Sequence, residues 1–198
     1  GNTSFNVTKS LVASTTFDLS RSKKNPLINN YFNSMGRGIM MAPTSRNYDE
    51  DGNWITGGTN KNQQTAAFYE QFYDRETQTT RMMGNFNLKW TITKGLTATA
   101  QYAMFNNAYR GSYYAFGADG DSPNFIDTTR STTETRTETH RDSFQAFLNY
   151  KGTFKDVHNL NVTAGYDYMK WRYWYLTATS KNSVSDKVPI LSSGTEFE

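Results

Sequence analysis

Few side chains of this sequence are of types that do covalent chemistry, whereas its aromatic side chains are numerous. The chain has 2 His and no Cys, against 13 Tyr, 13 Phe and 4 Trp. His140 and Ser143 are close along the chain, but they fall on opposite faces of an extended strand and so cannot form a nucleophile and base pair. Asp119 and Asp121 lie in a glycine-rich turn without apolar surroundings that would raise the pKa of a carboxyl group. We therefore expect no enzymatic activity.

A calcium site is the next interpretation to consider. Asp49, Asp51 and Gly52 resemble the start of a calcium-binding loop, but the nearest later carboxylate, Glu70, is too far along the chain. The same residues are typical of a tight turn, because Asp and Gly accept its backbone geometry. We predict the turn, and neither a metal nor another cofactor.

Aromatic residues are the best candidates for a binding site. Trp171, Tyr173 and Tyr175 alternate along one side of an extended strand. Flat rings with a polar edge suit the faces of sugars or the side chains of peptides. The alternative role is packing, either in an aromatic girdle or against a loop. Three more tyrosines, in a neighbouring loop, are candidates by the same argument: Tyr109, Tyr113 and Tyr114.

The strand that carries the first three candidates is the most regular part of the chain. From Leu160 to Tyr168, every second residue is Leu, Val, Ala, Tyr or Tyr, and the residues between them are Asn, Thr, Gly and Asp. This period of two predicts a strand with one apolar and one polar face. Lys170 and Arg172 follow on the apolar side, so we expect the strand to leave an apolar layer there and enter water.

The same unit occurs three times. Three turns end in a leucine that starts a new strand, and an aromatic residue stands six positions after each leucine. Six residues of a strand tilted by about 40° climb roughly 15 Å, which covers much of an apolar band about 25 Å tall. The repeat therefore fits a membrane-spanning hairpin. The pairs are Leu11 and Phe17, Leu96 and Tyr102, and Leu160 and Tyr166.

The amino-acid composition is consistent with a protein built of strands and not of membrane-spanning helices. The mean hydropathy is -0.76, and no window reaches the ~20 consecutive apolar residues that a spanning helix needs. The charges are interleaved and sum to +3, so there is no basic face for nucleic acid. Without cysteine there are neither disulfides nor thiolate metal ligands.

The periodic segments make about six strands in three hairpins, with short turns at one end and long loops at the other. We expect the loops at about residues 23–78, 109–127 and 180–198, with a short helix at Gln64–Tyr73 in the first. Thr128–Asp142 is polar on both faces, so we expect it in water, held by cross-strand charges. The residues expected to face lipid are Leu11, Phe17, Phe86, Leu88, Trp90, Leu96, Tyr102, Phe144, Leu148, Leu160, Val162 and Tyr166.

This asymmetry is typical of an outer-membrane barrel with short periplasmic turns and long extracellular loops. Six strands do not close such a barrel, because the smallest have about eight and an open edge in lipid leaves backbone groups unpaired. The predicted fold is therefore all-β: an antiparallel transmembrane β-barrel segment that forms one arc of a larger barrel. We expect both ends of the sequence to be cuts within that barrel.

Three motifs add a resemblance. They are the hairpin Asn87–Tyr102, the loop Tyr48–Trp54 (YDEDGNW), and His158–Tyr168 (HNLNVTAGYDY) with the aromatic cluster after it. Together they resemble the SusC/RagA family of TonB-dependent outer-membrane transporters of Bacteroidetes, over about Phe5 to Leu191 and the middle of the family's barrel. The resemblance implies a barrel of about 22 strands closed by a plug, a SusD-like lipoprotein as partner, and import of glycans or peptides with energy from TonB. The plug, the TonB box and the last barrel strand are not among these residues.

Two other interpretations stay open. One is a surface binding or scaffold barrel that presents its long loops to a partner. The other is a soluble, carbohydrate-binding β-sandwich, which would bury the apolar faces between two sheets. The uniformly polar positions on one face, and loops that are long at only one end, favour the barrel.

Overall fold

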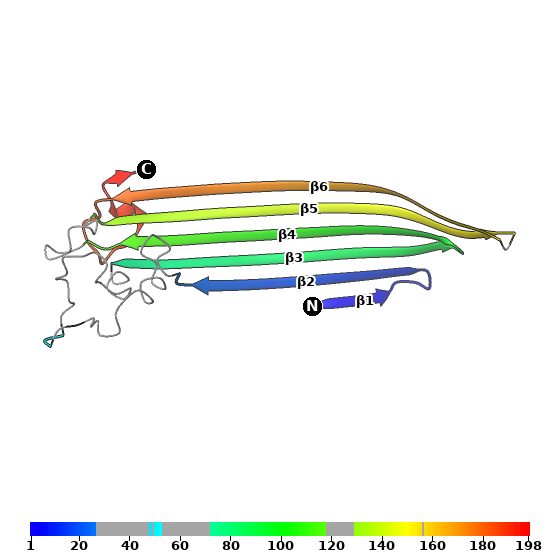
Figure 1. Cartoon of the computed structure of the whole chain (residues 1–198), viewed down its shortest axis with the longest axis horizontal. Coiled ribbons are helices and arrows are strands. Elements are labelled where there is room, and N and C mark those ends of the chain that lie inside the picture. Colours follow the sequence, from blue (N-terminus) through cyan, green and yellow to red (C-terminus); the bar gives the residue numbers. More distant parts are fainter. Residues whose placement is uncertain (27–47, 49, 53–71, 118–128, 156) are drawn as a thin grey trace. The chain divides into compact units, whose positions relative to one another are not determined.

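The structure is a computed structural model that describes residues 1–26, 48, 50–52, 72–117, 129–155 and 157–198. Long antiparallel strands dominate it (Figure 1). The elements are β1 (Asn2–Asn6), β2 (Leu11–Lys24), β3 (Tyr73–Thr93), β4 (Leu96–Ala115), β5 (Ser131–Phe154), β6 (His158–Lys181), the short 3-10 helix η2 (Leu191–Ser193) and β7 (Glu196–Phe197).

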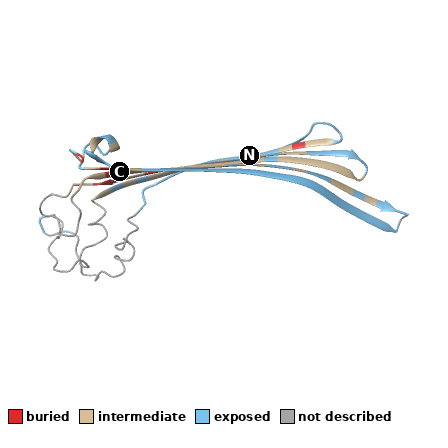
Figure 2. Ribbon diagram, turned by 90° about the horizontal axis from the view of Figure 1, so that it is seen from above, coloured by how far each residue is buried: buried red, intermediate tan, exposed pale blue. Residues whose placement is uncertain are grey.

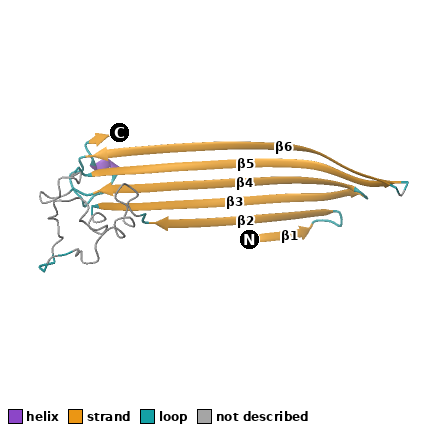
Figure 3. Cartoon of the chain, viewed as in Figure 1, coloured by secondary structure: helices purple, strands orange, loops and turns teal. Residues whose placement is uncertain are grey.

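The strands of the described residues belong to one 7-stranded sheet in which each strand pairs with its neighbours in sequence, from β1 at one edge to β7 at the other (Figure 3). The β1–β2 pair sets Phe5 opposite Ala13 and Ser4 opposite Ser14. The predicted all-β, antiparallel barrel segment is thus confirmed. A β-sandwich needs a second sheet packed on the first, and the described residues form a single sheet.

Short and long connections alternate as predicted. β3 and β4 are joined through Lys94 and Gly95 alone, and Gly95 has the left-handed backbone (φ +86°) that such a tight turn requires. The turn between β5 and β6 likewise contains a positive-φ residue, Lys155 (φ 52°). These two turns and the turn between β1 and β2 all lie in unit 1, at the same end of its strands (Figure 1).

The strands run further into the predicted loops than the sequence pattern indicated. β4 continues through Ala115 and β3 begins at Tyr73, so residues 109–115 and 73–78 are strand and the loop boundaries predicted there were wrong. Backbone pairing continues there because the ladder needs no apolar alternation once its neighbours are in register. Of the predicted helix Gln64–Tyr73, residues 64–71 lie outside the described residues, and Tyr73 starts a strand.

Contacts between strands show which residues share a face of the sheet. Tyr102 on β4 donates a hydrogen bond to Asp142 on β5, and Arg172 on β6 donates to the same carboxylate. Because side chains alternate between the two faces along a strand, the other even-numbered residues of these strands lie on the same face. We call it the apolar face, and the opposite one the polar face. The lining of a shallow groove on the apolar face includes Leu88, Trp90, Ala98, Ala100, Ala146, Leu148, Ala164 and Tyr166.

The chain divides into two compact units. Unit 1 comprises residues 1–22, 79–108 and 137–175, and unit 2 comprises residues 23–78, 109–136 and 176–198. Large apolar side chains of unit 1 stay open to solvent, for example Phe86 (46%), Trp90 (48%) and Val162 (48%). Buried positions are few in both units (Figure 2). Among the described residues they are Ala13 in unit 1, and Gly111, Tyr114, Ala115, Thr132, Ser180 and Ser183 in unit 2.

The predicted polar strand forms the first part of β5. Glu134 lies 3.6 Å from Arg110 on β4 and 3.7 Å from Arg136 on its own strand. On the other face, Thr133 and Thr135 share hydrogen bonds of 3.1 Å with threonines of β6. Each exposed ion pair contributes at most about 1 kcal/mol, so β-favouring threonines and backbone pairing hold this strand more than charge does. In the part of the chain that the structure describes, no helix has the length and apolarity to cross a membrane.

Candidate functional site

The aromatic residues predicted on β6 lie on the polar face of unit 1. The rings of Trp171 and Tyr173 are 6.1 Å apart at an angle of 36°. Trp171 is 64% exposed and Tyr173 is 53% exposed, and Tyr175 follows at the next position of the same face with 61% exposure. The three side chains therefore present ring surface that a bound molecule can cover.

A second aromatic cluster lies in unit 2. Tyr73 on β3 stacks on Tyr113 on β4, with ring centroids 5.5 Å apart and planes 28° apart. The guanidinium of Arg75 lies 5.2 Å from the Tyr73 centroid and 5.6 Å from that of Tyr113, which is a cation–π arrangement. Tyr113 was a predicted candidate. Tyr73 and Arg75 were not predicted as site residues, because the sequence pattern placed them in a loop. Their positions two residues apart could have indicated a strand.

Two other predicted tyrosines also lie on β4. Tyr109 is on a strand and not in a loop, two positions before Gly111 and on the same face as Tyr113. Tyr114 points to the opposite face, where it is only 2% exposed, and its hydroxyl donates to Asp186 over 2.9 Å. A buried ring offers no surface to a ligand, so the prediction of Tyr114 as a binding residue was wrong.

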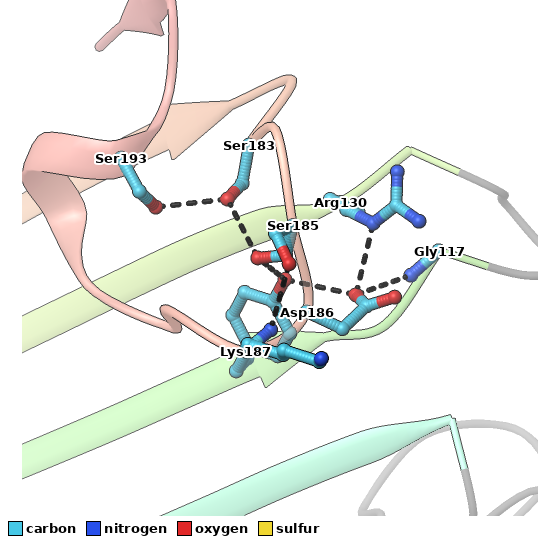
Figure 4. A network of polar contacts seen from close by, with 8 residues as sticks. Gly117, Arg130, Ser183, Ser185, Asp186, Lys187 and Ser193 are labelled. Atoms are coloured by element: carbon cyan, nitrogen blue, oxygen red, sulfur yellow. Dashed lines mark hydrogen bonds and ion pairs between the residues drawn. The ribbon is translucent and has the colours of Figure 1, made fainter.

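Asp186 instead organises a polar network in unit 2 (Figure 4). Its Oδ1 atom accepts hydrogen bonds from the Tyr114 hydroxyl at 2.9 Å and the Gly117 amide at 3.0 Å. The Nε atom of Arg130 lies 3.0 Å from the same oxygen. Ser183 donates to the Ser185 carbonyl at 3.2 Å within the same segment. These contacts attach the chain that follows β6 to β4 and β5.

The network shifts two pKa values. Burial alone raises the pKa of Asp186, but the bonds from Gly117 and Tyr114 and the charge of Arg130 outweigh burial, so the pKa lies below its usual value. Burial, together with the bond to Asp186, raises the pKa of Tyr114. The folded chain thus favours a charged carboxylate beside a neutral phenol.

Replacing Asp186 by Asn should loosen this attachment, and acid should do the same in the wild type. Because the pKa of Asp186 is lowered, its contribution is present above the ordinary carboxyl pKa of 3.8 and is lost as the pH falls below that value. A charged hydrogen bond contributes about 1.5 kcal/mol, so hydrogen exchange of the Gly117 amide near pH 6 should be about tenfold faster in the variant. Glu198→Gln, at an exposed ion pair with Lys181, is the control. Equal exchange in Asp186→Asn and wild type would contradict the assignment.

A pocket on the polar face of unit 1 was not predicted. It has a volume of about 290 Å³, and its lining includes Asp18, Asn85, Phe105 and Arg141 from four different strands. The Arg141 guanidinium lies 5.4 Å from the Phe105 centroid. The Oδ1 atom of Asn85 is buried and has no hydrogen-bond partner among the described residues. The pocket therefore combines a carboxylate, a guanidinium and an unused acceptor over an apolar ring.

The groups considered for chemistry stay apart. His140 lies 3.5 Å from Glu138, and the Ser143 hydroxyl donates to the Ala103 carbonyl at 3.4 Å. Among the described residues, no three His, Asp or Glu side chains gather closely enough to hold a metal ion. Four acidic residues named above lie outside the described residues: Asp49, Glu70, Asp119 and Asp121.

These features define a class of structure: the wall of a β-barrel, with one apolar face, one polar face and tight turns at one end. Among solved structures, the chain is similar to the RagAB peptide transporter, with a TM-score of 0.78 and 18% identity over 98% of this chain and 22% of that chain. It is also similar to the RagAB peptide importer in its closed-closed state, with a TM-score of 0.77 and the same identity and coverage. No protein family model and no curated protein matches the sequence.

The predicted resemblance to a RagA-type barrel is confirmed at the level of fold, because 18% identity shows the fold alone. The chain spans 22% of the length of the two structures.

Proposed function

We propose that the chain is part of the barrel wall of an outer-membrane importer. The observation that carries this proposal is the exposed apolar face of the single sheet. A large apolar surface of this kind marks a place where another molecule or a membrane covers the protein. A lipid bilayer supplies such a layer, and the likeness in fold to RagAB supports that choice. The apolar face then meets lipid, and the polar face lines the inside of the barrel.

The cargo in this proposal is a glycan or a peptide, and it passes along the polar face. Trp171 and Tyr173 offer exposed ring surface there, and Asp18 and Arg141 offer opposite charges in the neighbouring pocket. The solved structures with this fold are named as a peptide transporter and a peptide importer, which supports peptides. The proposal further includes a SusD-like lipoprotein as partner and TonB as energy source, acting through parts of the protein outside this chain. The chain has no catalytic role in it.

The test is the double variant Trp171→Ala/Tyr173→Ala in the intact transporter, with uptake of a defined oligopeptide mixture and of labelled oligosaccharides as readouts. An aromatic contact contributes about 1 kcal/mol beyond its buried area, so removal of both rings should weaken cargo binding by tenfold or more. Trp174→Ala is the matched control, because Trp174 lies on the same strand, is 68% exposed, and points to the apolar face.

Unchanged uptake and unchanged cargo binding in the double variant would reject the role of these two rings. If the intact protein binds glycans or peptides at the surface but moves none inward, the alternative of a surface binding barrel takes the place of the importer.

A further inference from the structure

The groove of the apolar face is floored by small side chains. Ala98 and Ala100 on β4 and Ala146 on β5 line it, and Trp90 on β3 and Tyr166 on β6 lie at its two sides in the strand order. Its volume is about 590 Å³, and it is lined mainly by apolar groups. The small alanines between the larger rings leave a shallow channel, and an extended hydrocarbon chain makes more van der Waals contacts in such a channel than on a flat surface.

A polar cluster lies further along the same face of unit 1. The Tyr102 hydroxyl donates to Asp142 Oδ1 at 2.9 Å, and Arg172 Nη2 donates to Asp142 Oδ2 at 3.3 Å. Both carboxylate oxygens are therefore engaged, and the charge of Arg172 is balanced by that of Asp142. Glu138 has its own neighbour, His140, at 3.5 Å.

Lys170 adds a positive charge that no carboxylate of this polar cluster balances. It lies on β6 two positions before Arg172 and on the same face, with an exposed side chain. Among the described residues, no carboxylate forms an ion pair with Lys170. Its neighbours on this face include Tyr168 (50% exposed) and Trp174 (68% exposed), aromatic types that concentrate where a bilayer meets water.

The spacing between the groove and Lys170 matches one leaflet of a bilayer. Ala164, which lines the groove, and Lys170 are six residues apart on β6. At ~3.3 Å per residue and a tilt of about 40°, this separation is about 15 Å along the membrane normal. The apolar band of an outer-membrane barrel is about 25 Å tall, so one leaflet accounts for about 12 Å, and a side chain about 15 Å from the middle lies at the headgroups.

We propose that the apolar face of unit 1 binds one phosphate-bearing, anionic lipid, with its headgroup at Lys170 and an acyl chain in the alanine groove. This inference rests on the proposed function, because it requires the apolar face to meet a bilayer. The lipid belongs to the leaflet away from the tight turn between β5 and β6, since Lys170 lies further from that turn along β6 than Ala164 of the groove does. The ammonium group of Lys170 favours an anionic headgroup, and the alanines of the groove determine where the acyl chain lies.

The experiment is native mass spectrometry of the intact transporter with dimyristoyl phosphatidylglycerol or dimyristoyl phosphatidylcholine, in wild type and Lys170→Gln. One lysine near a membrane surface contributes about 1 kcal/mol toward an anionic lipid, so phosphatidylglycerol retention should fall about fivefold in the variant, while phosphatidylcholine retention stays the same. Lys89→Gln is the matched control, because Lys89 is an exposed lysine on the polar face. Inorganic phosphate at millimolar concentration should not displace the lipid.

Equal retention of the two lipids by wild type, or equal retention of phosphatidylglycerol by wild type and Lys170→Gln, overturns the inference. So does occupation of this face by a second protein copy that excludes lipid. Displacement by inorganic phosphate alone would assign Lys170 to a free anion and not to a lipid. These failures differ from failure of the proposed function, in which the protein neither inserts into bilayers nor takes up cargo.

Discussion

Leu148→Arg is expected to destabilise the protein in a bilayer by about 2–4 kcal/mol, the loss typical of a charge on the lipid side of a barrel near mid-depth. Leu148 lies on the apolar face of β5, is 43% exposed, and lines the groove with Ala146 and Tyr166. None of the residues that line this groove is Asp or Glu, so a guanidinium there would enter hydrocarbon without a carboxylate partner from the groove. The loss is measured as the change in the free energy of unfolding by guanidinium chloride in lipid vesicles.

Gln145→Arg is the control on the same strand. Gln145 is exposed and shares the polar face with Arg141 and Ser143, so arginine there meets water. A surface substitution of this kind changes stability by no more than about 0.5 kcal/mol. Equal losses in the two variants would show that both faces of the sheet meet the same environment, and the barrel-wall proposal would then be given up.

The three hairpins were predictable from the sequence because the patterns that indicate them, tight turns and alternating side chains, are local. Turns such as Thr93–Leu96 are too short for anything but an antiparallel return, and alternation along β6 indicates which face is apolar. These signals fix the pairing within each hairpin, whereas the order of the hairpins in the sheet is known from the structure, because long connections follow β2 and β4. The same alternation assigns Trp171 and Tyr173 to the polar face, and in the structure their rings lie 6.1 Å apart.

The outer parts of the strands were not predictable in the same way. Residues 109–115 of β4 are rich in Tyr, Gly and Ser and show no apolar alternation, so composition indicated a loop. Tyr113 and Tyr114 then received the same role, although adjacent strand residues point to opposite faces. Tyr113 stacks on Tyr73, whereas Tyr114 is buried beside Asp186.

The polar-face pocket could not be found from sequence for a different reason. Its residues Asp18, Asn85 and Arg141 come from three strands, far apart in the chain. Which of them meet depends on the register between strands, and alternation within one strand carries no information on register. A pattern can therefore assign a face to each residue but cannot assemble a site from several strands.

Gly95→Ala is expected to cost on the order of 3 kcal/mol, from about 1–3 kcal/mol of backbone strain and about 1 kcal/mol for a weakened hydrogen bond. Gly95 has φ +86°, and a Cβ atom there would clash with the Lys151 carbonyl oxygen of β5. The same residues are linked by a 2.7 Å hydrogen bond from the Lys151 amide to the Gly95 carbonyl. A methyl group must therefore push the β3–β4 turn away from β5 and stretch that bond.

Gly52→Ala separates the two causes of this loss. Gly52 has nearly the same backbone angle, φ +85°, but no atom of the described residues lies within 4 Å of the position its Cβ would take. Only backbone strain acts there, so the free energy of unfolding should fall by about 1 kcal/mol. A loss at Gly95 no larger than the loss at Gly52 would mean that the turn moves freely past β5. The larger loss expected at Gly95 instead follows from contact between two hairpins, which makes this turn a part of the sheet and not merely a connection between strands.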